Sequence, residues 1–419
     1  MSTPSIKVGQ GNWGVKAGNL LGYANTEKKF SPVEFTSTRA LNTATRVNAS
    51  GNIEIVNANI PRIDYFGGQA SLLVESSSQN LALQSENFGT TWSPVQILAF
   101  GSGSVLNTTA TLDPYGTNVA DLIVANTTLN QHRIDQTTTS VSGSYVFSVF
   151  LKAAGYGFAR LRIGGQGAVF NLSTGVVFST DAGITSSIQS FGNGWCRCII
   201  GKAASVANEI VRINMQPTAS TADFVGDGTS GFYVFGAQYE AGSVATSYIP
   251  TTTAAVTRNA DVISVTGVAG LIGQTEGTLY AEVDVRSVNT NTIISLHDGT
   301  GNNRFIVYFF NSTTLIVDIR VATVNANYSV TIPAIPANGG IYKVALGYKV
   351  NDYCFALNGT TYASTASRGV PATTQINLGS NFLGASQLND RIRAVALYQT
   401  RLPNTTTDGS PSLQSITTL

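Results

Sequence analysis

Short runs of alternating apolar and polar residues dominate this chain, and they constrain its fold more than any other feature. The clearest run puts an apolar residue at every second position, at Leu279, Ala281, Val283 and Val285. The positions between and after them carry polar or amphipathic side chains, at Tyr280, Glu282, Asp284 and Arg286. Successive side chains of a strand point to opposite faces, so this pattern predicts a strand with one buried face. Gly, Asn, Asp or Ser ends most such runs, and helical periodicity is almost absent. The chain therefore predicts many short strands, as in β-sandwiches.

One turn signal is especially specific. The alternating run of Tyr353, Phe355 and Leu357 leads directly into Asn358-Gly359. Both residues of an Asn-Gly pair accept the positive φ that a type I′ turn requires, so this sequence predicts a β-hairpin.

The composition excludes several classes of protein. Charged residues make up 11% of the 419 residues, against roughly 25% in an ordinary soluble domain, and the formal net charge is +1. This balance predicts no nucleic-acid partner and no disordered tail. The N-terminus lacks the features of a signal peptide, and no apolar run is long enough for a membrane span, so no membrane insertion is predicted. The odd number of cysteines, 3, argues against a disulfide framework.

We therefore predict an all-β fold with two tandem jelly-roll β-sandwiches after an extended, turn-rich N-terminal region. Residues 1–84 are too irregular to promise a core of their own, and are assigned to that region. Residues 85–250 form the first predicted sandwich, and 251–257, which follow Pro250 and are rich in Thr and Ala, form a linker. Residues 258–419 form the second sandwich, ending in an extended tail.

A search for catalytic motifs finds no nucleophile elbow and no phosphate-binding loop. Glu282 and Asp284 lie two apart, so a strand would place both carboxylates on one face, about 7 Å apart by strand rise. Retaining glycosidases on jelly-roll scaffolds need a further acid on such a strand, but Arg286 and Ser287 follow here. The polar outer face of an ordinary strand explains the pair equally well. We predict that the protein is not an enzyme.

No metal or cofactor site is predicted. His132 and His297 have no Cys or His neighbours at metal-ligand spacing. Asp223, Asp227 and Asp298 lie in Gly-rich turns, where oxygen ligands for calcium could converge. Asp in a turn, however, normally bonds the backbone.

Two loops combine the residue types of a sugar-binding site. Sugars present both a polar rim and an apolar ring face, so their sites join aromatic rings to amide, carboxylate and guanidinium groups. The predicted glycan-binding residues are Tyr156, Phe158, Arg160 and Arg162 in one loop region and Asp298, Asn302, Asn303 and Arg304 in the other. The alternative for each of the aromatic residues is packing at the rim of the core.

A succession of motifs resembles a known group of proteins. The N-terminal motifs are residues 35–39, 44–48, 51–54, 61–65, 72–75, 80–81, 84–88 and Trp92. Their order resembles the N-terminal part of bacteriophage virion proteins of the head-spike and tail-fibre type. The next motifs are residues 145–153, 170–175, 192–197, 236–242, 247–252 and 256–261. They resemble the lectin-like carbohydrate-binding module of the same group.

The last third of the chain is similar to concanavalin A-like (laminin-G-like) domains. The motifs that carry this similarity are residues 348–349, the Asn358-Gly359 hairpin, 378–379 and 392–398. The resemblance spans about residues 35–402 and implies a virion surface protein whose sandwiches bind glycans. It identifies no binding residues, because the shared positions are those of turns and core.

The resemblance implies a non-enzymatic appendage of a phage or phage-like particle: a head spike, head fibre or tail fibre that binds host surface polysaccharide during adsorption. The N-terminal region would attach to a capsid or tail protein, and the protein would lie on the virion surface after synthesis in the host cytoplasm. Shallow sugar sites bind weakly, and several copies raise their effective concentration, so we expect a homo-oligomer, a trimer first. The alternatives are a decoration protein without host recognition and a spike that depolymerises polysaccharide.

Overall fold

The computed structural model describes residues 3–9, 11–26, 29–98, 106–107, 111–286, 291–335, 339–364 and 367–418. The described chain is almost entirely β, with three short 3-10 turns and one helix of five residues, α1 (Leu413–Thr417). No helix in these ranges is long and apolar enough to cross a membrane. The all-β prediction is confirmed.

The chain forms two compact units that are interleaved in sequence. Unit 1 contains residues 1–41, 57–77 and 259–419, and unit 2 contains residues 42–56 and 78–258. Each unit is a β-sandwich with its own buried apolar cluster.

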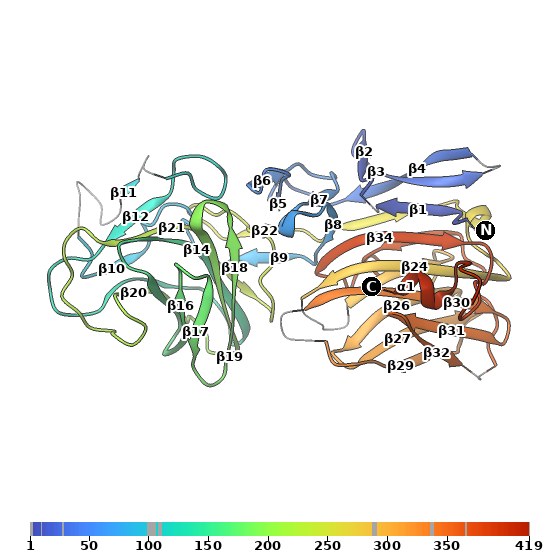
Figure 1. Ribbon diagram of the computed structural model, residues 1–419. Helices are drawn as coiled ribbons and strands as arrows, with labels where there is room; N and C mark the ends of the chain where they lie inside the picture. The colour runs from blue at the N-terminus through green and yellow to red at the C-terminus, as the bar shows by residue number, and fades with distance from the viewer. Residues whose placement is uncertain are drawn as a thin grey trace. The chain divides into compact units, whose positions relative to one another are not determined.

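In unit 1, one layer runs through consecutive antiparallel pairings from its N-terminal strands to its C-terminal half. In pairing order its strands are β3 (Asn19–Thr26), β1 (Ile6–Gly9), β34 (Asp390–Tyr398), β24 (Glu276–Val285), β30 (Gly340–Lys349), β31 (Asp352–Leu357) and β32 (Thr360–Ser364). Shorter strands extend it: β2 (Gly14–Lys16) pairs with β3, β8 (Ser71–Val74) with β34, and β7 (Arg62–Asp64) with β8. Figure 1 shows β1, coloured blue, directly beside β34, coloured red.

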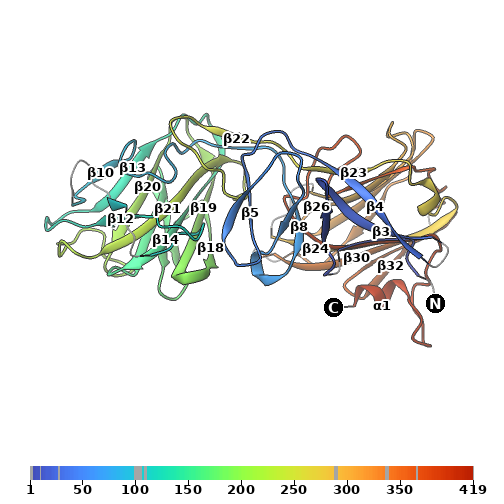
Figure 2. The same ribbon diagram turned by 90° about the horizontal axis from the view of Figure 1, so that it is seen from above.

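The second layer of unit 1 is also antiparallel. Its strands are β4 (Lys29–Thr38), β23 (Val262–Val265), β33 (Gln375–Leu378), β25 (Asn291–His297), β26 (Arg304–Asn311), β27 (Thr314–Val321) and β29 (Tyr328–Thr331), with β28 (Val324–Asn325) pairing beside β27. β4 also pairs with β3, so it joins the two layers. In Figure 2, α1 lies beside β30 and β32, against which it packs.

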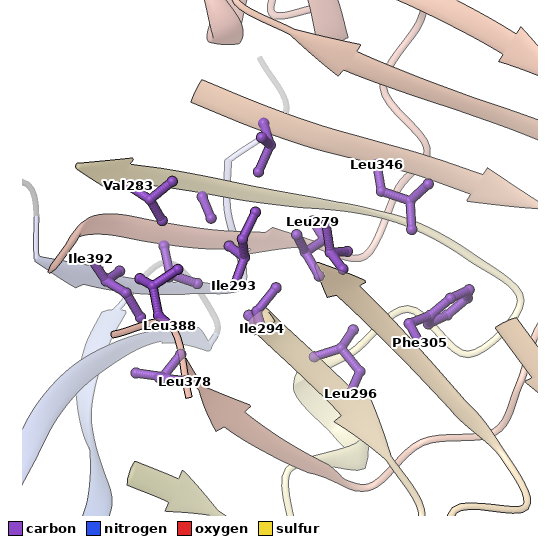
Figure 3. Close-up of a cluster of buried hydrophobic side chains, with 14 of the residues drawn as sticks. Leu279, Val283, Ile293, Ile294, Leu296, Phe305, Leu346, Leu378, Leu388 and Ile392 are labelled. Atoms are coloured by element: carbon purple, nitrogen blue, oxygen red, sulfur yellow. The ribbon is translucent and has the colours of Figure 1, made fainter. Parts of the chain in front are cut away.

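The alternating patterns account for the core of unit 1. Leu279, Ala281 and Val283 of β24 are buried, as their period of two predicts, and Leu296 and Phe305 of the other layer are buried as well. Figure 3 shows these side chains, except that of Ala281, labelled in the space between the layers. Burying a Leu or Phe completely contributes about 1.5–3 kcal/mol. The predicted hairpin is also confirmed, because Asn358 and Gly359 have φ values of 45° and 82°.

Unit 2 contains two six-stranded antiparallel sheets. The first follows the order β10 (Ser93–Val95), β13 (His132–Thr137), β20 (Ile210–Gln216), β15 (Phe158–Ile163), β16 (Gln166–Asn171) and β17 (Val176–Thr180). The second follows the order β11 (Leu106–Asn107), β12 (Asp121–Val124), β21 (Gly231–Ala241), β14 (Gly143–Ala154), β19 (Trp195–Ser205) and β18 (Ile184–Phe191). Two short pairings complete the unit: β5 (Ala44–Val47) with β6 (Ile53–Val56), and β9 (Ser78–Asn80) with β22 (Val256–Arg258).

The structure divides residues 1–84 differently from the prediction. They do not form a region apart: 1–41 and 57–77 belong to unit 1, whereas 42–56 and 78–84 belong to unit 2. The reason is pairing over long sequence distances, since β1 pairs with β34 and β4 pairs with β23. The two sandwiches are therefore not strictly in tandem.

The predicted linker 251–257 is part of unit 2. Thr251 is buried, and its N–H donates to the hydroxyl of Ser85 at 2.8 Å. Val256 and Thr257 lie in β22, which pairs with β9. The hydrogen bonds of Thr251 and the pairing of β22 with β9 hold this segment in unit 2, although its composition predicted a linker.

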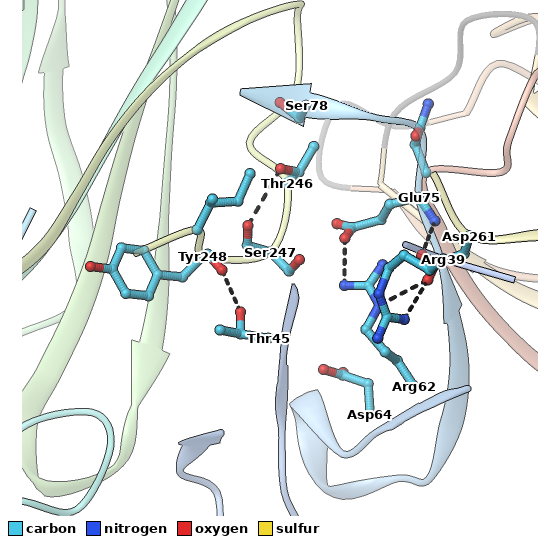
Figure 4. Close-up of polar contacts among 12 residues, drawn as sticks. Arg39, Thr45, Arg62, Asp64, Glu75, Ser78, Thr246, Ser247, Tyr248 and Asp261 are labelled. Atoms are coloured by element: carbon cyan, nitrogen blue, oxygen red, sulfur yellow. Dashed lines mark hydrogen bonds and ion pairs between the residues drawn. The ribbon is translucent and has the colours of Figure 1, made fainter. Parts of the chain in front are cut away.

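A buried ion-pair cluster ties the early segments of unit 1 to its later strands. Arg39 donates to the carboxylate of Asp261 at 2.9 Å, and Arg62 pairs with both Asp261 and Glu75. All four side chains are at most 5% exposed. Figure 4 shows both guanidinium groups directed at the carboxylate of Asp261. A buried charge is strongly destabilising without its partner, so each residue of the cluster depends on segments that lie far apart in the sequence.

Candidate functional site

The two sheets of unit 2 differ on the faces that point away from the core. On the second sheet part of this face is apolar and buried: Phe150, Trp195 and Phe235 pack with Ile53 and Tyr248 in a separate cluster. Tyr248 is further fixed because its carbonyl accepts a hydrogen bond from Thr45 at 2.6 Å (Figure 4). The same face also carries the buried polar side chains of Ser148 and Arg197, and Arg197 donates to the hydroxyl of Ser148 at 2.9 Å.

The first sheet carries a polar outer face that we call the arginine face. Its side chains alternate with the core residues of three adjacent strands. It comprises Arg133 and Asp135 on β13, Arg212, Asn214 and Gln216 on β20, and Phe158, Arg160 and Arg162 on β15. The residues between them, such as Ile134, Ile213 and Leu161, are buried in the core of unit 2.

Strand register sets the neighbours on the arginine face. Asn214 lies opposite Arg160 on one side and Arg133 on the other. Gln216 lies opposite Phe158, and Arg212 lies opposite Arg162. Directly opposed residues have Cβ atoms about 4.5–5.5 Å apart, so these side chains form one continuous patch.

Internal bonds hold part of the arginine face in place. Asp135 accepts from the Nε of Arg133 at 3.1 Å and of Arg212 at 3.4 Å. Asp181, which follows β17, accepts from Arg160 at 2.6 Å. Arg162 donates to the carbonyl oxygen of Gly165 at 2.8 Å. These bonds fix the positions of the four arginine side chains relative to the sheet.

Asn214 and Gln216 are unusual members of this patch. Both side chains are buried, at 5% and 3% exposed. The amide nitrogen of Asn214 donates to Gln131 at 3.3 Å, but the side-chain oxygens of Asn214 and Gln216 have no hydrogen-bond partner among the described residues. A buried acceptor without a donor is costly, and a hydrogen bond from a water molecule or from a ligand would remove that cost.

The structure brings the first group of predicted residues together in part. Phe158, Arg160 and Arg162 lie on the arginine face, and the ring of Phe158 meets that of Phe178 at 5.9 Å, edge to face. Tyr156 instead packs against Phe224 at 5.1 Å and touches the core of unit 2. Its burial raises the pKa of its hydroxyl. Tyr156 thus fits the packing alternative better than a role as an exposed sugar platform.

The second predicted group lies in unit 1 and is largely engaged within its own loop. Asp298 accepts from the backbone of Thr300, at 2.8 Å, and from both the backbone and the side chain of Asn303. These bonds lower the pKa of Asp298 to about 2, against the effect of its desolvation. Arg304 pairs with Asp318 at 2.6 Å.

Asn302, the fourth residue of this group, is exposed. The hydrogen bonds and the ion pair of Asp298, Asn303 and Arg304 shape the loop. They occupy polar groups that would otherwise be able to bind a sugar.

The carboxylates considered for hydrolysis each lie against an arginine. Glu282 pairs with Arg393 at 3.1 Å and accepts from Tyr280 at 3.3 Å. Asp284 lies 3.7 Å from Arg286. Asp227 accepts from the backbone of Ser230, as a turn residue does. Within the described ranges, no three His, Cys, Asp or Glu residues gather as a metal site would require.

Sequence reasoning missed the partner strands of the arginine face. Arg133 and Asp135 alternate with Ile134, and Arg212 and Asn214 alternate with Ile213, so the local signal was present. What was missing is the order of strands, which places β20 between β13 and β15.

Comparisons with known proteins give structural likenesses only. Neither a scan against protein-family models nor a search of curated proteins found a match. The chain is similar to the CBM40 of Ruminococcus gnavus IT-sialidase, with 18% identity over 36% of this chain and 87% of that chain, at a TM-score of 0.30. Domains LG4-5 of the mouse laminin alpha1 chain show 9% identity over 78% and 89% of the two chains, at a TM-score of 0.25. Trypanosoma rangeli sialidase in complex with the inhibitor DANA shows 11% identity over 92% and 80%, at a TM-score of 0.24. At these TM-scores the likenesses carry no argument about function.

Proposed function

We propose that this chain binds host surface polysaccharide through the arginine face of unit 2, without cleaving it, as an appendage of a phage or phage-like particle. The observation that carries the binding proposal is the pair of buried oxygens of Asn214 and Gln216 that lack donors. Sugar hydroxyls are donors of the required kind, and the rings of Phe158 and Phe178 beside them can pack against an apolar sugar face.

The particle setting is supported by the succession of N-terminal and lectin-like motifs in the sequence. Attachment to a capsid or tail protein through the N-terminal region, a position on the virion surface and assembly as a homo-oligomer, a trimer first, remain predictions. Mass measurement of the purified protein tests the last: a monomer alone at high concentration would count against it. Labelled antibodies against the chain, imaged on purified particles, test the first two.

The binding experiment uses the full chain and immobilised bacterial surface polysaccharides. We expect retention of the wild-type protein and loss of retention in the double variant Asn214→Leu, Gln216→Met. Gln189→Met on β18 is the control for Gln216→Met, because it makes that substitution on the second sheet of unit 2, and it should bind as the wild type does. Equal retention of all three proteins would overturn the assignment of the site.

Absence of cleavage is tested on the same polysaccharides. Glu282 lies against Arg393 and Asp284 near Arg286, so neither pairs with a second acid as a glycosidase requires. We expect no release of reducing ends during incubation with the protein. Release that is lost in Glu282→Gln would establish a depolymerase instead.

A further inference from the structure

The arginine face has more positive than negative charge. The face has four guanidinium groups and two carboxylates: Arg133 and Arg212 pair with Asp135, and Arg160 pairs with Asp181. Arg162 has no carboxylate within ion-pairing distance among the described residues, and it donates instead to the carbonyl oxygen of Gly165.

The arginines also affect one another. Burial, followed by the positive charges of Arg160, Arg212 and Arg133, lowers the pKa of Arg162, although the carboxylate of Asp181 acts in the opposite direction. Bringing a negative group to this patch would relieve that repulsion. A ligand without charge would leave it in place.

Two of these arginines also have hydrogen-bond donors that are not paired within the described residues. The Nε atoms of Arg160 and Arg162 are buried and have no hydrogen-bond partner among the described residues. The two residues are two positions apart on β15, so their side chains leave the same face with Cα atoms about 7 Å apart. Arg162 lies opposite Gly167 on β16, where a Cβ atom would come within 1.8 Å of the carbonyl oxygen of Leu161 and within 2.9 Å of the Cγ of Arg162. The close approach of the two backbones therefore requires glycine here.

Donors and acceptors that lack hydrogen-bond partners among the described residues therefore lie on neighbouring strands. Asn214 is opposite Arg160 in the register, and Gln216 is the next outward residue on β20. The guanidinium N–H groups match the oxygens of a carboxylate, and the two amide oxygens match hydroxyl groups. One ligand class offers both within a single ring: a sugar that carries a carboxylate.

We infer that the arginine face recognises a carboxylate-bearing sugar residue of a polysaccharide, with its carboxylate at Arg160 and Arg162 and its hydroxyls at Asn214 and Gln216. This inference rests on the proposed function, which it narrows from glycans in general to acidic glycans. The aromatic pair of Phe158 and Phe178 would border the same sugar.

The test compares each acidic polysaccharide with its own carboxyl-reduced form, in which every carboxylate has become a primary alcohol. The full chain is titrated with both forms of uronate-rich and sialate-rich polymers at physiological salt. We expect the native polymer to bind at least about tenfold more tightly than the reduced one, since a charge-assisted hydrogen bond is worth somewhat more than the free energy of a tenfold change.

Variants assign the effect to residues. Arg160→Gln and Arg162→Gln should each weaken binding of the native polymer about tenfold and leave binding of the reduced polymer unchanged. Arg162→Lys keeps the charge but removes the Nε donor. Its affinity for the native polymer should lie between those of the wild type and Arg162→Gln. Arg46→Gln on β5 is the matched control outside the arginine face, and should bind as the wild type does.

The possible outcomes distinguish recognition of an acidic sugar from glycan binding in general. Equal binding of native and reduced polymers, lost in Asn214→Leu but unaffected by Arg160→Gln, would overturn the acidic ligand and retain glycan binding. Binding that follows sulfate content rather than carboxylate would also overturn it. Failure to bind any polymer in either form would overturn both.

Discussion

Arginine is used differently in the two units. In unit 1, Arg39 and Arg62 are fully buried and lie against the carboxylates of Asp261 and Glu75. On the arginine face of unit 2, by contrast, Arg160 retains 27% of its side-chain exposure. The neighbouring Arg162 lacks a carboxylate partner among the described residues.

The difference separates stability from recognition. A buried cation must be paired within the fold, so its carboxylate cannot be removed without cost. A half-buried cation is still solvated in part, so the fold tolerates its incomplete pairing and its charge stays open to a ligand. Four predictions test this contrast.

The largest effect is expected from Asp261→Asn in unit 1. The change removes the carboxylate shared by Arg39 and Arg62 and leaves two buried charges undercompensated. We expect the free energy of unfolding, measured with urea, to fall by about 3–5 kcal/mol. The control is Glu276→Gln, whose partner Lys349 is exposed, and it should cost less than about 1 kcal/mol. Equal effects of the two changes would contradict the role given to burial.

A carboxylate that is buried without an arginine partner should make the folded protein less stable as the pH rises. Asp121 in unit 2 accepts from the N–H of Phe88 at 2.7 Å, and its burial raises its pKa to about 6. The folded state therefore binds a proton more tightly than the unfolded state does. Stability is highest below about pH 4 for this group and declines as the pH rises through about 6, by about 3 kcal/mol. Asp121→Asn should remove this decline in urea unfolding curves from pH 4 to 7, and an unchanged decline would refute the assignment.

Gln216→Met should separate stability from binding within the arginine face. The side-chain oxygen of Gln216 is buried and has no hydrogen-bond donor among the described residues. An apolar side chain of similar length removes this acceptor and the free-energy cost of burying it. We expect thermal unfolding to be unchanged or to rise by the equivalent of up to about 1 kcal/mol, while polysaccharide binding weakens. A loss of stability above that size would show that the oxygen is satisfied in the folded protein.

The smallest change in stability is expected for Arg160→Gln and Arg162→Gln. Arg160 pairs with a carboxylate that is 38% exposed, and Arg162 donates to the carbonyl oxygen of Gly165 in a turn. Partly exposed pairs contribute about 0–1 kcal/mol. Both variants should unfold within about 1 kcal/mol of the wild type in urea, in contrast to Asp261→Asn. A cost comparable to that of Asp261→Asn would remove the distinction between the two kinds of arginine.

The sequence predicted the strands better than their partners. Leu279 and Val283 alternate with polar residues, and this local pattern is sufficient to fix which face is buried. It is not sufficient to show that β1 pairs with β34, because that pairing depends on a registration nearly four hundred residues away along the chain. Residues 1–84 therefore looked like a separate region although most of them complete a sandwich.

The same limit applies to the candidate site. Arg160 and Arg162 were found because aromatic and glycine residues surround them in the sequence. Asn214 and Gln216 were missed because their importance depends on the neighbouring strands that bury them. Asp298 and Asn303 were chosen for their residue types, but short loops use those types to bond themselves.

The most direct measurement is hydroxyl-radical footprinting of the full chain with and without a bound polysaccharide. Phe178 on the first sheet is 58% exposed, and Phe191 on the second sheet is partly buried and serves as the internal reference. We expect the polysaccharide to protect Phe158 and Phe178 and to leave the labelling of Phe191 unchanged. Protection confined to the loop of Asn302 in unit 1, with Phe158 and Phe178 labelled as before, would contradict recognition by the arginine face.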